Sequence, residues 1–148
     1  MRYTVAEYKN ILEDKSVPFG IILQNGGGVE YRFDLSQERF SKVQDISPTA
    51  DFDTFSNFER TFKENFVDKG SITTTDDAGG KKVINITNQS FLDYLSEKFQ
   101  NVYQFQKPRE LQVTEKQKAL RTIFEYLVLG QKPEGVDDET VKQISLLP

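Results

Sequence analysis

Two segments near the N-terminus have the apolar patterns of neighbouring strands. Residues 15–23, KSVPFGIIL, are apolar on both faces from Phe19 to Leu23, which is typical of a central strand. In residues 29–33, VEYRF, apolar side chains alternate with charged ones, which is typical of a strand with one buried face. The Asn-Gly-Gly-Gly sequence between them, residues 25–28, predicts a hairpin turn.

The first twelve residues fit either a helix or a strand. Thr4 and Glu7 have the spacing of a helix capping box, and Val5 and Tyr8 belong to a set of apolar residues at helical spacing. The sequence RYTVAEY also alternates in the manner of a strand. These local signals favour a helix, and a strand remains the alternative.

The middle of the chain holds the patterns of two helices. The first is expected to begin at Asp51, which can cap its first turn, and to end at Gly70. The second, shorter helix is expected to begin at Ser90. The apolar stripe of the first helix recurs at i, i+3, i+7 and i+11: Phe55, Phe58, Phe62 and Phe66. A stripe at this spacing is more typical of a core-facing helix than of an aromatic cofactor site.

The segment before the C-terminus has the clearest helical pattern. Apolar pairs repeat at every turn across residues 119–128. Thr114 and Gln117 have the spacing of a capping box, and Gly130 occupies the position of a C-cap. Residues 131–148 are expected to form an acidic tail.

Two further pairs of strands complete the expected sheet. Residues 71–75 and 81–87 flank the sequence DDAGG, which predicts a hairpin with a glycine turn. The short strands VYQFQ and RELQV flank Pro108, which cannot donate to a ladder and therefore marks a turn or a sheet edge. Residues 1–130 are thus predicted to form a single α+β domain, a mostly antiparallel sheet with three or four helices packed on one face.

The composition excludes several kinds of chemistry. The chain has no cysteine and no histidine, so disulfides, thiolate zinc sites and the usual serine-protease triad are impossible. Any catalysis would use carboxylates, lysine, tyrosine or a metal held by oxygen ligands. A net charge of −4 argues against a dedicated nucleic-acid or membrane-surface protein. Because the sequence also lacks a signal peptide and a run of ~20 apolar residues, a cytoplasmic protein is expected.

Three motifs resemble ligand sites but fail the requirements of those sites. A phosphate-binding loop needs a helix after its glycines, whereas residues 26–28 precede a strand and the next lysine is Lys42. A calcium loop that starts at Asp76 would need a glycine at its sixth position and a glutamate at its twelfth, and the sequence has neither. Asp51 and Asp53 could form a metal-binding pair, but roles at a helix N-terminus already account for both.

One segment, residues 98–121, is locally basic. It holds six lysines and arginines against two glutamates, a net charge of 6 − 2 = +4. Tyr103 and Phe105 are interleaved with Lys107 and Arg109, which is the combination that stacks bases over a charged groove. Strand alternation, however, would direct both aromatic side chains into the core, and the acidic whole favours that interpretation. These four residues are the candidate binding residues of the chain.

Several stretches in order resemble a bacterial family, the domain of unknown function 3037. YTVAEY resembles the opening strand of the family, SVPFGIIL its second strand, and YRF, DLSQERFSKV and SPTADFD the segments that follow. VYQFQKPRELQV and ALRTIFEYLV resemble its C-terminal part, so the similarity spans residues 3–129. The chain departs from the family in having Pro18-Phe19 where an Asn-containing pair is usual. The resemblance implies a strand at residues 3–8 and an intracellular bacterial protein, because family members are often encoded beside HipA-like kinases.

The leading functional hypothesis is a non-catalytic module that binds or regulates another bacterial protein. The resemblance makes a kinase-like neighbour one candidate partner. The second hypothesis is a nucleic-acid-binding module that uses the basic segment, and the third is a hydrolase with a carboxylate-bound metal. No catalytic residue, cofactor, metal ligand or membrane contact is predicted.

Overall fold

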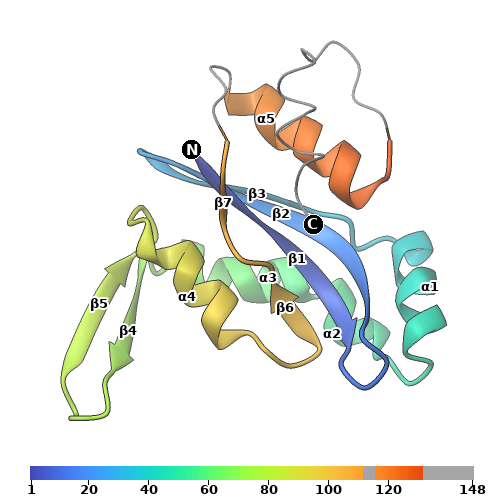
Figure 1. Cartoon of the computed structure of the whole chain (residues 1–148), viewed down its shortest axis with the longest axis horizontal. Coiled ribbons are helices and arrows are strands. Elements are labelled where there is room, and N and C mark those ends of the chain that lie inside the picture. The colour runs from blue at the N-terminus through green and yellow to red at the C-terminus, as the bar shows by residue number, and fades with distance from the viewer. Residues whose placement is uncertain (112–115, 132–148) are drawn as a thin grey trace.

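The computed structural model describes residues 1–111 and 116–131 (Figure 1). The strands are β1 (Arg2–Asn10), β2 (Lys15–Asn25), β3 (Gly28–Phe33), β4 (Ser71–Thr75), β5 (Lys81–Asn85), β6 (Tyr103–Phe105) and β7 (Arg109–Glu110). The helices are α1 (Gln37–Ile46), α2 (Phe52–Ser56), α3 (Phe58–Phe62), α4 (Ser90–Lys98) and α5 (Lys116–Ile123). Two π-helical segments continue α3 and α5: η1 (Lys63–Val67) and η2 (Phe124–Val128). These elements confirm the predicted α+β class.

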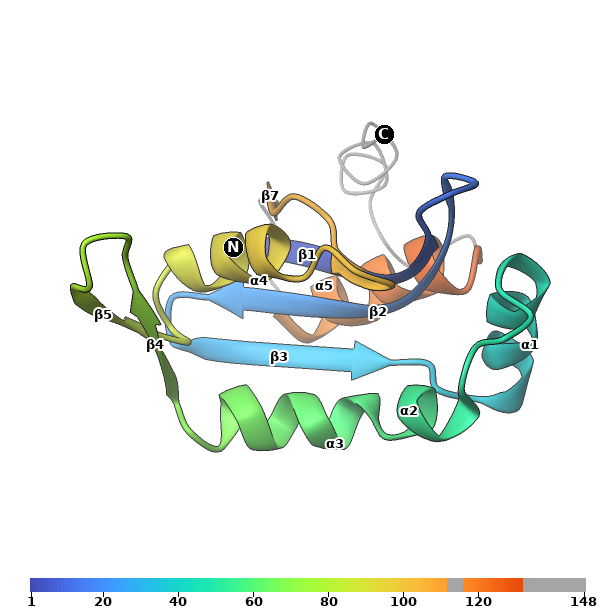
Figure 2. The same cartoon turned by 90° about the horizontal axis from the view of Figure 1, so that it is seen from below.

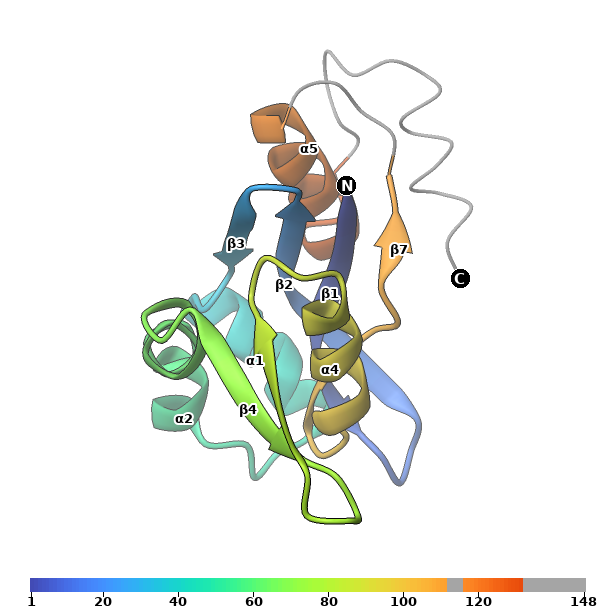
Figure 3. The same ribbon diagram turned by 90° about the vertical axis from the view of Figure 1, so that its left-hand side faces the viewer.

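The main sheet is antiparallel, and its strand order is β3-β2-β1-β6. The short strands β6 and β7 both pair with β1, so they share its outer edge on either side of Pro108. Asn25 pairs with Gly28, which confirms that the glycine-rich stretch is the turn between β2 and β3. β4 and β5 form the other predicted hairpin, which projects from the body of the molecule (Figures 1 and 3).

The N-terminal segment is the strand β1, so the local preference for a helix is wrong. Tyr3 and Val5 are buried on one face of the sheet, and Ala6 and Tyr8 are buried on the other. β1 also pairs with β2 along one edge and with β6 and β7 along the other. Two buried faces and two paired edges outweigh a capping signal, which is worth only about 1 kcal/mol. The strand agrees with what the family resemblance implied.

A β-bulge changes which residues of β2 face each side of the sheet. The register between β1 and β2 shifts between Ala6 and Glu7, which leaves Phe19 without a partner on β1. Because side chains alternate along a strand, one extra residue moves the side chains beyond it to the opposite face of the sheet. Phe19 therefore packs in the same core cluster as Ile22, whereas Ile21 packs in the cluster on the other face.

Helices cover both faces of the sheet (Figure 3). One face packs against α1, α2, α3 and α4, which matches the prediction of three or four helices on one face; Phe55 and Leu92 are central to this core. The other face packs against α5 and η2 through Ile123 and Phe124. This second layer departs from the prediction, and its cause is the burial of β1 and β2 on both faces, which a single layer of helices cannot supply.

The phenylalanine stripe faces the larger core, as predicted, although it spans three elements rather than one helix. Asp51 caps α2 by accepting a hydrogen bond from the Thr54 amide at 3.3 Å, and α2 ends at Ser56, with Asn57 as its C-cap. The members of the stripe are buried or half-buried on α2, α3 and η1: Phe55, Phe58, Phe62 and Phe66. The segment ends at Gly70, whose φ of +71° is in the left-handed region that glycine adopts readily.

The ends of the other two helices agree with the sequence in part. Ser90 is the first residue of α4 rather than its cap, and the Asn88 side chain accepts the Ser90 amide hydrogen bond at 2.9 Å instead. Gly130 follows η2 with a φ of +67°, as expected of a C-cap glycine. The expected capping box at Thr114 and residues 132–148 of the expected tail lie outside what the structure describes.

An ion pair fixes the connection between β3 and α1. The Arg39 side chain is buried, and its Nε lies 3.3 Å from the Asp34 carboxylate. Arg39 also donates to the carbonyl of Pro18 at 3.3 Å, which ties α1 to β2 next to the bulge. Burial alone would raise the pKa of Asp34, but hydrogen bonds from Ser36 and Arg39 and the positive charge of Arg39 lower it below its usual value.

Gly20 is the position at which a small substitution should be most costly. A Cβ atom on this residue would overlap the ring of Phe33, which is held by the neighbouring rings of Phe19 and Phe58. Gly20→Ala should lower the free energy of unfolding, measured in urea, by about 1–3 kcal/mol, as expected of overpacking. Gly27→Ala is the matched control, because nothing lies within 4 Å of its Cβ position. Equal stability of the two variants would contradict the packing described for Phe33.

The Asp34–Arg39 pair should make stability depend on pH in the acid range. Because the pKa of Asp34 is lower in the folded state, its stabilisation is present above the unfolded pKa of about 4 and is lost as pH falls through the folded value. Asp34→Asn should cost about 1.5–3 kcal/mol at pH 7, and this difference should shrink on acidification. Urea unfolding at pH 7 and at pH 3 tests both statements, with Glu38→Gln, an exposed change on α1, as the control. A difference that stays constant between the two pH values would contradict this role.

Candidate functional site

The two predicted aromatic binding residues pack against the larger core, as strand alternation favoured: Phe105 is buried and Tyr103 is half-buried. The ring of Tyr103 stacks on that of Phe58 at 5.2 Å and meets that of Tyr8 edge-on at 5.2 Å. Phe105 is only 4% exposed, and its ring lies 5.1 Å from that of Phe99. Burial, with smaller contributions from Tyr8 and Asp51, raises the pKa of Tyr103 to about 12. The buried Phe105 ring is closed to a stacked base, and one face of the Tyr103 ring is occupied by Phe58.

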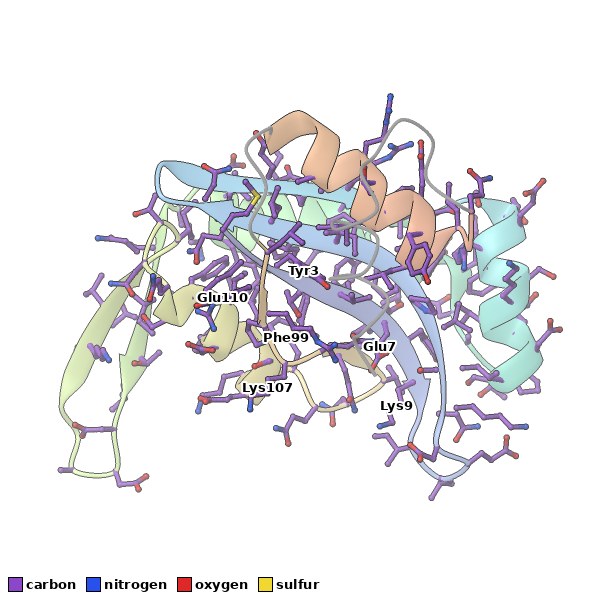
Figure 4. All side chains as sticks on the ribbon, turned by 45° about the horizontal axis from the view of Figure 1, so that its top comes forward. Tyr3, Glu7, Lys9, Phe99, Lys107 and Glu110 are labelled. Carbon is purple, nitrogen blue, oxygen red and sulfur yellow. The ribbon has the colours of Figure 1, made fainter. Side chains whose placement is uncertain are left out.

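The two predicted basic residues lie apart from these rings. Lys107 is exposed on the link between β6 and β7, where Figure 4 shows its side chain directed away from the sheet. Arg109 is half-buried on β7 and its charge acts on Tyr3. Burial raises the pKa of Tyr3 to about 12, and the nearby Arg109 limits the rise. The four residues therefore face different environments and do not form one site.

The segment that contains these residues covers the outer edge of β1. The Gln106 amide donates to the carbonyl of Val5 at 2.9 Å, and the Gln106 side chain donates to the Glu7 carboxylate at 3.0 Å. The hydroxyl of Thr4 donates to the carbonyl of Gln106. Because this segment already pairs with the outer edge of β1, that edge of β1 cannot accept a further strand.

The acidic motifs are used within the fold. Asp51 accepts hydrogen bonds from the Thr54 hydroxyl and amide, which lower the pKa of its carboxyl below the usual range and confirm its capping role. Asp76 accepts the amide hydrogen bonds of Ala78 at 3.0 Å and Gly80 at 2.6 Å inside the β4–β5 turn. Among the residues that the structure describes, no group of three or more acidic side chains could hold a metal ion.

An exposed apolar surface lies at the turn between β1 and β2. Leu12 is 98% exposed and Ile11 is 54% exposed, which is unusual for large aliphatic side chains. Val102, which is 40% exposed, lies at the base of this turn because its carbonyl accepts the Lys9 amide hydrogen bond at 2.7 Å. We call Ile11 and Leu12 the apolar tip.

The side chain of Asn10 holds the apolar tip in a defined conformation. Its Oδ1 accepts hydrogen bonds from the amides of Leu12 at 3.1 Å and Glu13 at 3.2 Å. Its Nδ2 donates to the carbonyl of Ile46 at 2.7 Å, which connects the turn to the end of α1. Leu12 is therefore presented from a braced turn rather than from a free loop.

Charged residues of both signs surround the apolar tip. Lys9 lies 3.4 Å from the Asp14 carboxylate, and Lys15 lies 3.5 Å from that of Glu13. Asp14, Lys15 and Glu13 are exposed, so these pairs add little stability, but they leave the surroundings of the tip without net charge. An apolar centre inside a polar rim is the usual anatomy of a protein–protein contact.

Sequence reasoning missed the apolar tip because its residues also fit the spacing of a helix. Ile11 and Leu12 continue the helical spacing of Val5 and Tyr8, so a helix over the first twelve residues would place all four on one apolar face. With β1 as a strand, the same residues follow its last paired position, Asn10, and enter the turn. The sequence Asn-Ile-Leu-Glu-Asp between two strands is the signal that could have identified an apolar turn.

Comparison with protein-family models, curated proteins and solved structures finds no match for this chain. The family resemblance described above therefore stays a prediction. No helix in the described part of the chain is long and apolar enough to cross a membrane.

Substitutions can separate a core role of the predicted residues from a binding role. Phe105→Ala should lower the free energy of unfolding by about 3–5 kcal/mol, because it removes a buried ring from the larger core. Lys107→Ala should change it by less than about 0.5 kcal/mol, because this side chain is exposed. Urea unfolding checks both values. A Phe105→Ala variant as stable as the parent would restore the surface interpretation.

Proposed function

We propose that the protein is a non-catalytic interaction module whose apolar tip inserts into an apolar pocket of another protein. The observation that carries the proposal is the 98% exposure of Leu12 in a turn that the Asn10 side chain fixes through hydrogen bonds to the Leu12 amide and the Ile46 carbonyl. An exposed leucine contributes nothing to the core of its own chain. A partner that buries it would gain about 1.5–3 kcal/mol of binding free energy.

The bracing of the turn supports the same role. A flexible loop loses conformational entropy when it binds, whereas a turn that is already fixed keeps more of its contact energy as affinity. The left-handed backbone of Asp14, with a φ of +53°, completes the turn, although a residue other than glycine adopts this conformation at a cost.

The charges around the tip favour a protein pocket over an anionic membrane surface. Glu13 and Asp14 follow Leu12 directly, so insertion of the tip would bring two carboxylates against lipid phosphates. A protein pocket with a rim of both signs can instead pair with these acids and with Lys9 and Lys15.

The family resemblance suggests which partners to examine first. It points to a bacterial protein, and kinase-like proteins encoded nearby are the first candidates, for which binding of this module would have a regulatory effect. The nucleic-acid alternative gains no support from the fold, because Tyr103 and Phe105 pack in the core.

Leu12→Asp should weaken partner binding without affecting the fold. The loss of one buried leucine should weaken the complex by about 10-fold to 150-fold, while the free energy of unfolding stays within about 0.5 kcal/mol of the parent. A photo-crosslinking residue at position 12, introduced in the native host, should capture the same partner, whose affinity is then measured by isothermal titration with purified proteins.

Val83→Asp is the matched control, because Val83 is also an exposed aliphatic residue, 61% accessible on β5, far along the chain from the tip. It should leave the affinity unchanged. Equal effects of the two substitutions, or a partner that crosslinks equally well from position 83, would refute docking through the apolar tip.

A further inference from the structure

The outer edge of β3 is the open edge of the main sheet. β3 is the terminal strand of the order β3-β2-β1-β6, and β2 is the only strand in the described residues that pairs with it. The opposite edge is formed by two short strands on either side of Pro108, which are features that discourage further pairing. β3 has six residues and no proline, so it presents a longer row of backbone donors and acceptors.

The register identifies which backbone groups point outward. In an antiparallel pair, hydrogen-bonded positions alternate along each strand. The Asp34 amide donates to the carbonyl of Phe19 at 2.7 Å, so the backbone groups of even-numbered residues of β3 face β2. The odd-numbered residues therefore direct their amides and carbonyls away from the sheet: Val29, Tyr31 and Phe33.

One face of the edge is apolar. The ring of Tyr31 lies 5.4 Å from that of Phe62, and the ring of Phe33 lies 5.2 Å from that of Phe58, both on α3. Tyr31 and Phe33 are only partly buried, so these contacts leave apolar surface next to the edge. A strand placed beside β3 would bury alternate side chains against this surface.

The other face of the edge carries one acid and one base, two residues apart. Glu30 and Arg32 share the face that α5 covers. Arg32 is exposed, and its guanidinium lies 4.3 Å from the centre of the Phe124 ring, which fixes its position near the edge. A neighbouring strand would therefore meet a negative and a positive charge in a defined order.

The position of α3 indicates whether a peptide or a second copy of the chain can pair with the β3 edge. Figures 2 and 3 show α3 running along β3 and reaching past its outer edge, on the side away from β2. A single added strand would lie over this helix. A second copy paired edge to edge would bring its own α3 to the same strip, where two helices need about 8–10 Å between their axes.

We propose that the β3 edge binds an extended segment of another protein by antiparallel strand addition. The segment has apolar residues opposite Phe33, Tyr31 and Val29, an acidic residue opposite Arg32 and a basic residue opposite Glu30. The antiparallel direction follows the rest of this sheet and gives the more stable ladder. Glu30 and Arg32 then occupy non-hydrogen-bonded positions, where cross-strand side chains approach most closely.

Two peptides of identical composition test the proposed order of charges. The first, Thr-Val-Glu-Val-Lys-Val-Thr, places glutamate opposite Arg32 and lysine opposite Glu30 in the antiparallel register. The second, Thr-Val-Lys-Val-Glu-Val-Thr, exchanges the charges and places like charges opposite each other. With labelled peptide at low concentration and the full chain as titrant, fluorescence anisotropy should show about fivefold or more tighter binding of the first. Amide shifts in nuclear magnetic resonance spectra should concentrate at Val29, Tyr31 and Phe33.

The double variant Glu30→Arg with Arg32→Glu should reverse the preference for the two peptides. A purely structural role of these side chains would weaken both peptides equally and could not exchange their order. Circular dichroism melting verifies that the variant is folded, and the wild-type preference and the map of amide shifts remain decisive if it is not. Leu12→Asp should leave peptide binding unchanged, which separates this surface from the apolar tip.

Three results would overturn the proposal. The first is equal affinity of the wild-type chain for the two peptides or a preference for the second, and the second is amide shifts confined to β6 and β7. The third is a dimer in analytical ultracentrifugation that Glu30→Arg dissociates, since the occupant of the edge would then be a second copy of the chain.

Discussion

The β1–β2 hairpin is buried on both faces of the sheet, and the remaining elements are arranged to cover it. The bulge at Phe19 places this ring in the larger core, while Ile21, two positions further along, packs under α5. A central hairpin that is apolar on both faces needs two covering layers, and these use most of the large side chains of the chain. Phe105 and the half-buried Tyr103 are among the side chains that these layers use. For this reason, residues that resemble a base-stacking surface pack inward.

The same constraint determines where the surface can bind a partner. Both faces of the main sheet are covered and one of its edges is closed by β6 and β7, so within the described part of this sheet the turn that joins β1 to β2 and the edge of β3 stay available. They differ in physical character. The apolar tip offers a side chain of high exposure with little backbone, whereas the β3 edge offers backbone groups with side chains that set the register. The two surfaces can thus be altered independently.

Local patterns predicted the elements in which one physical signal dominates. The alternation of residues 29–33, the glycine turn after Asn25 and the phenylalanine spacing from Phe55 to Phe66 each follow from one period or one turn, and each is confirmed. The first strand failed because a capping box and a helical spacing competed with the alternation around Val5. The apolar tip was missed with it, since Leu12 fits the apolar face of a helix by its spacing but lies in an exposed turn when β1 is a strand.

Local patterns and composition were enough to predict the α+β class, the two glycine hairpins, the cap at Asp51 and the absence of cysteine and histidine chemistry, because each depends on neighbouring residues or on composition alone. Strand alternation also favoured the inward direction of Tyr103 and Phe105. Pairing and packing in the folded chain were needed to show that β1 is a strand and that α5 covers the second face. These outcomes depend on pairing and packing between residues far apart in the chain, such as Ala6 with Phe105. No local pattern contains that information.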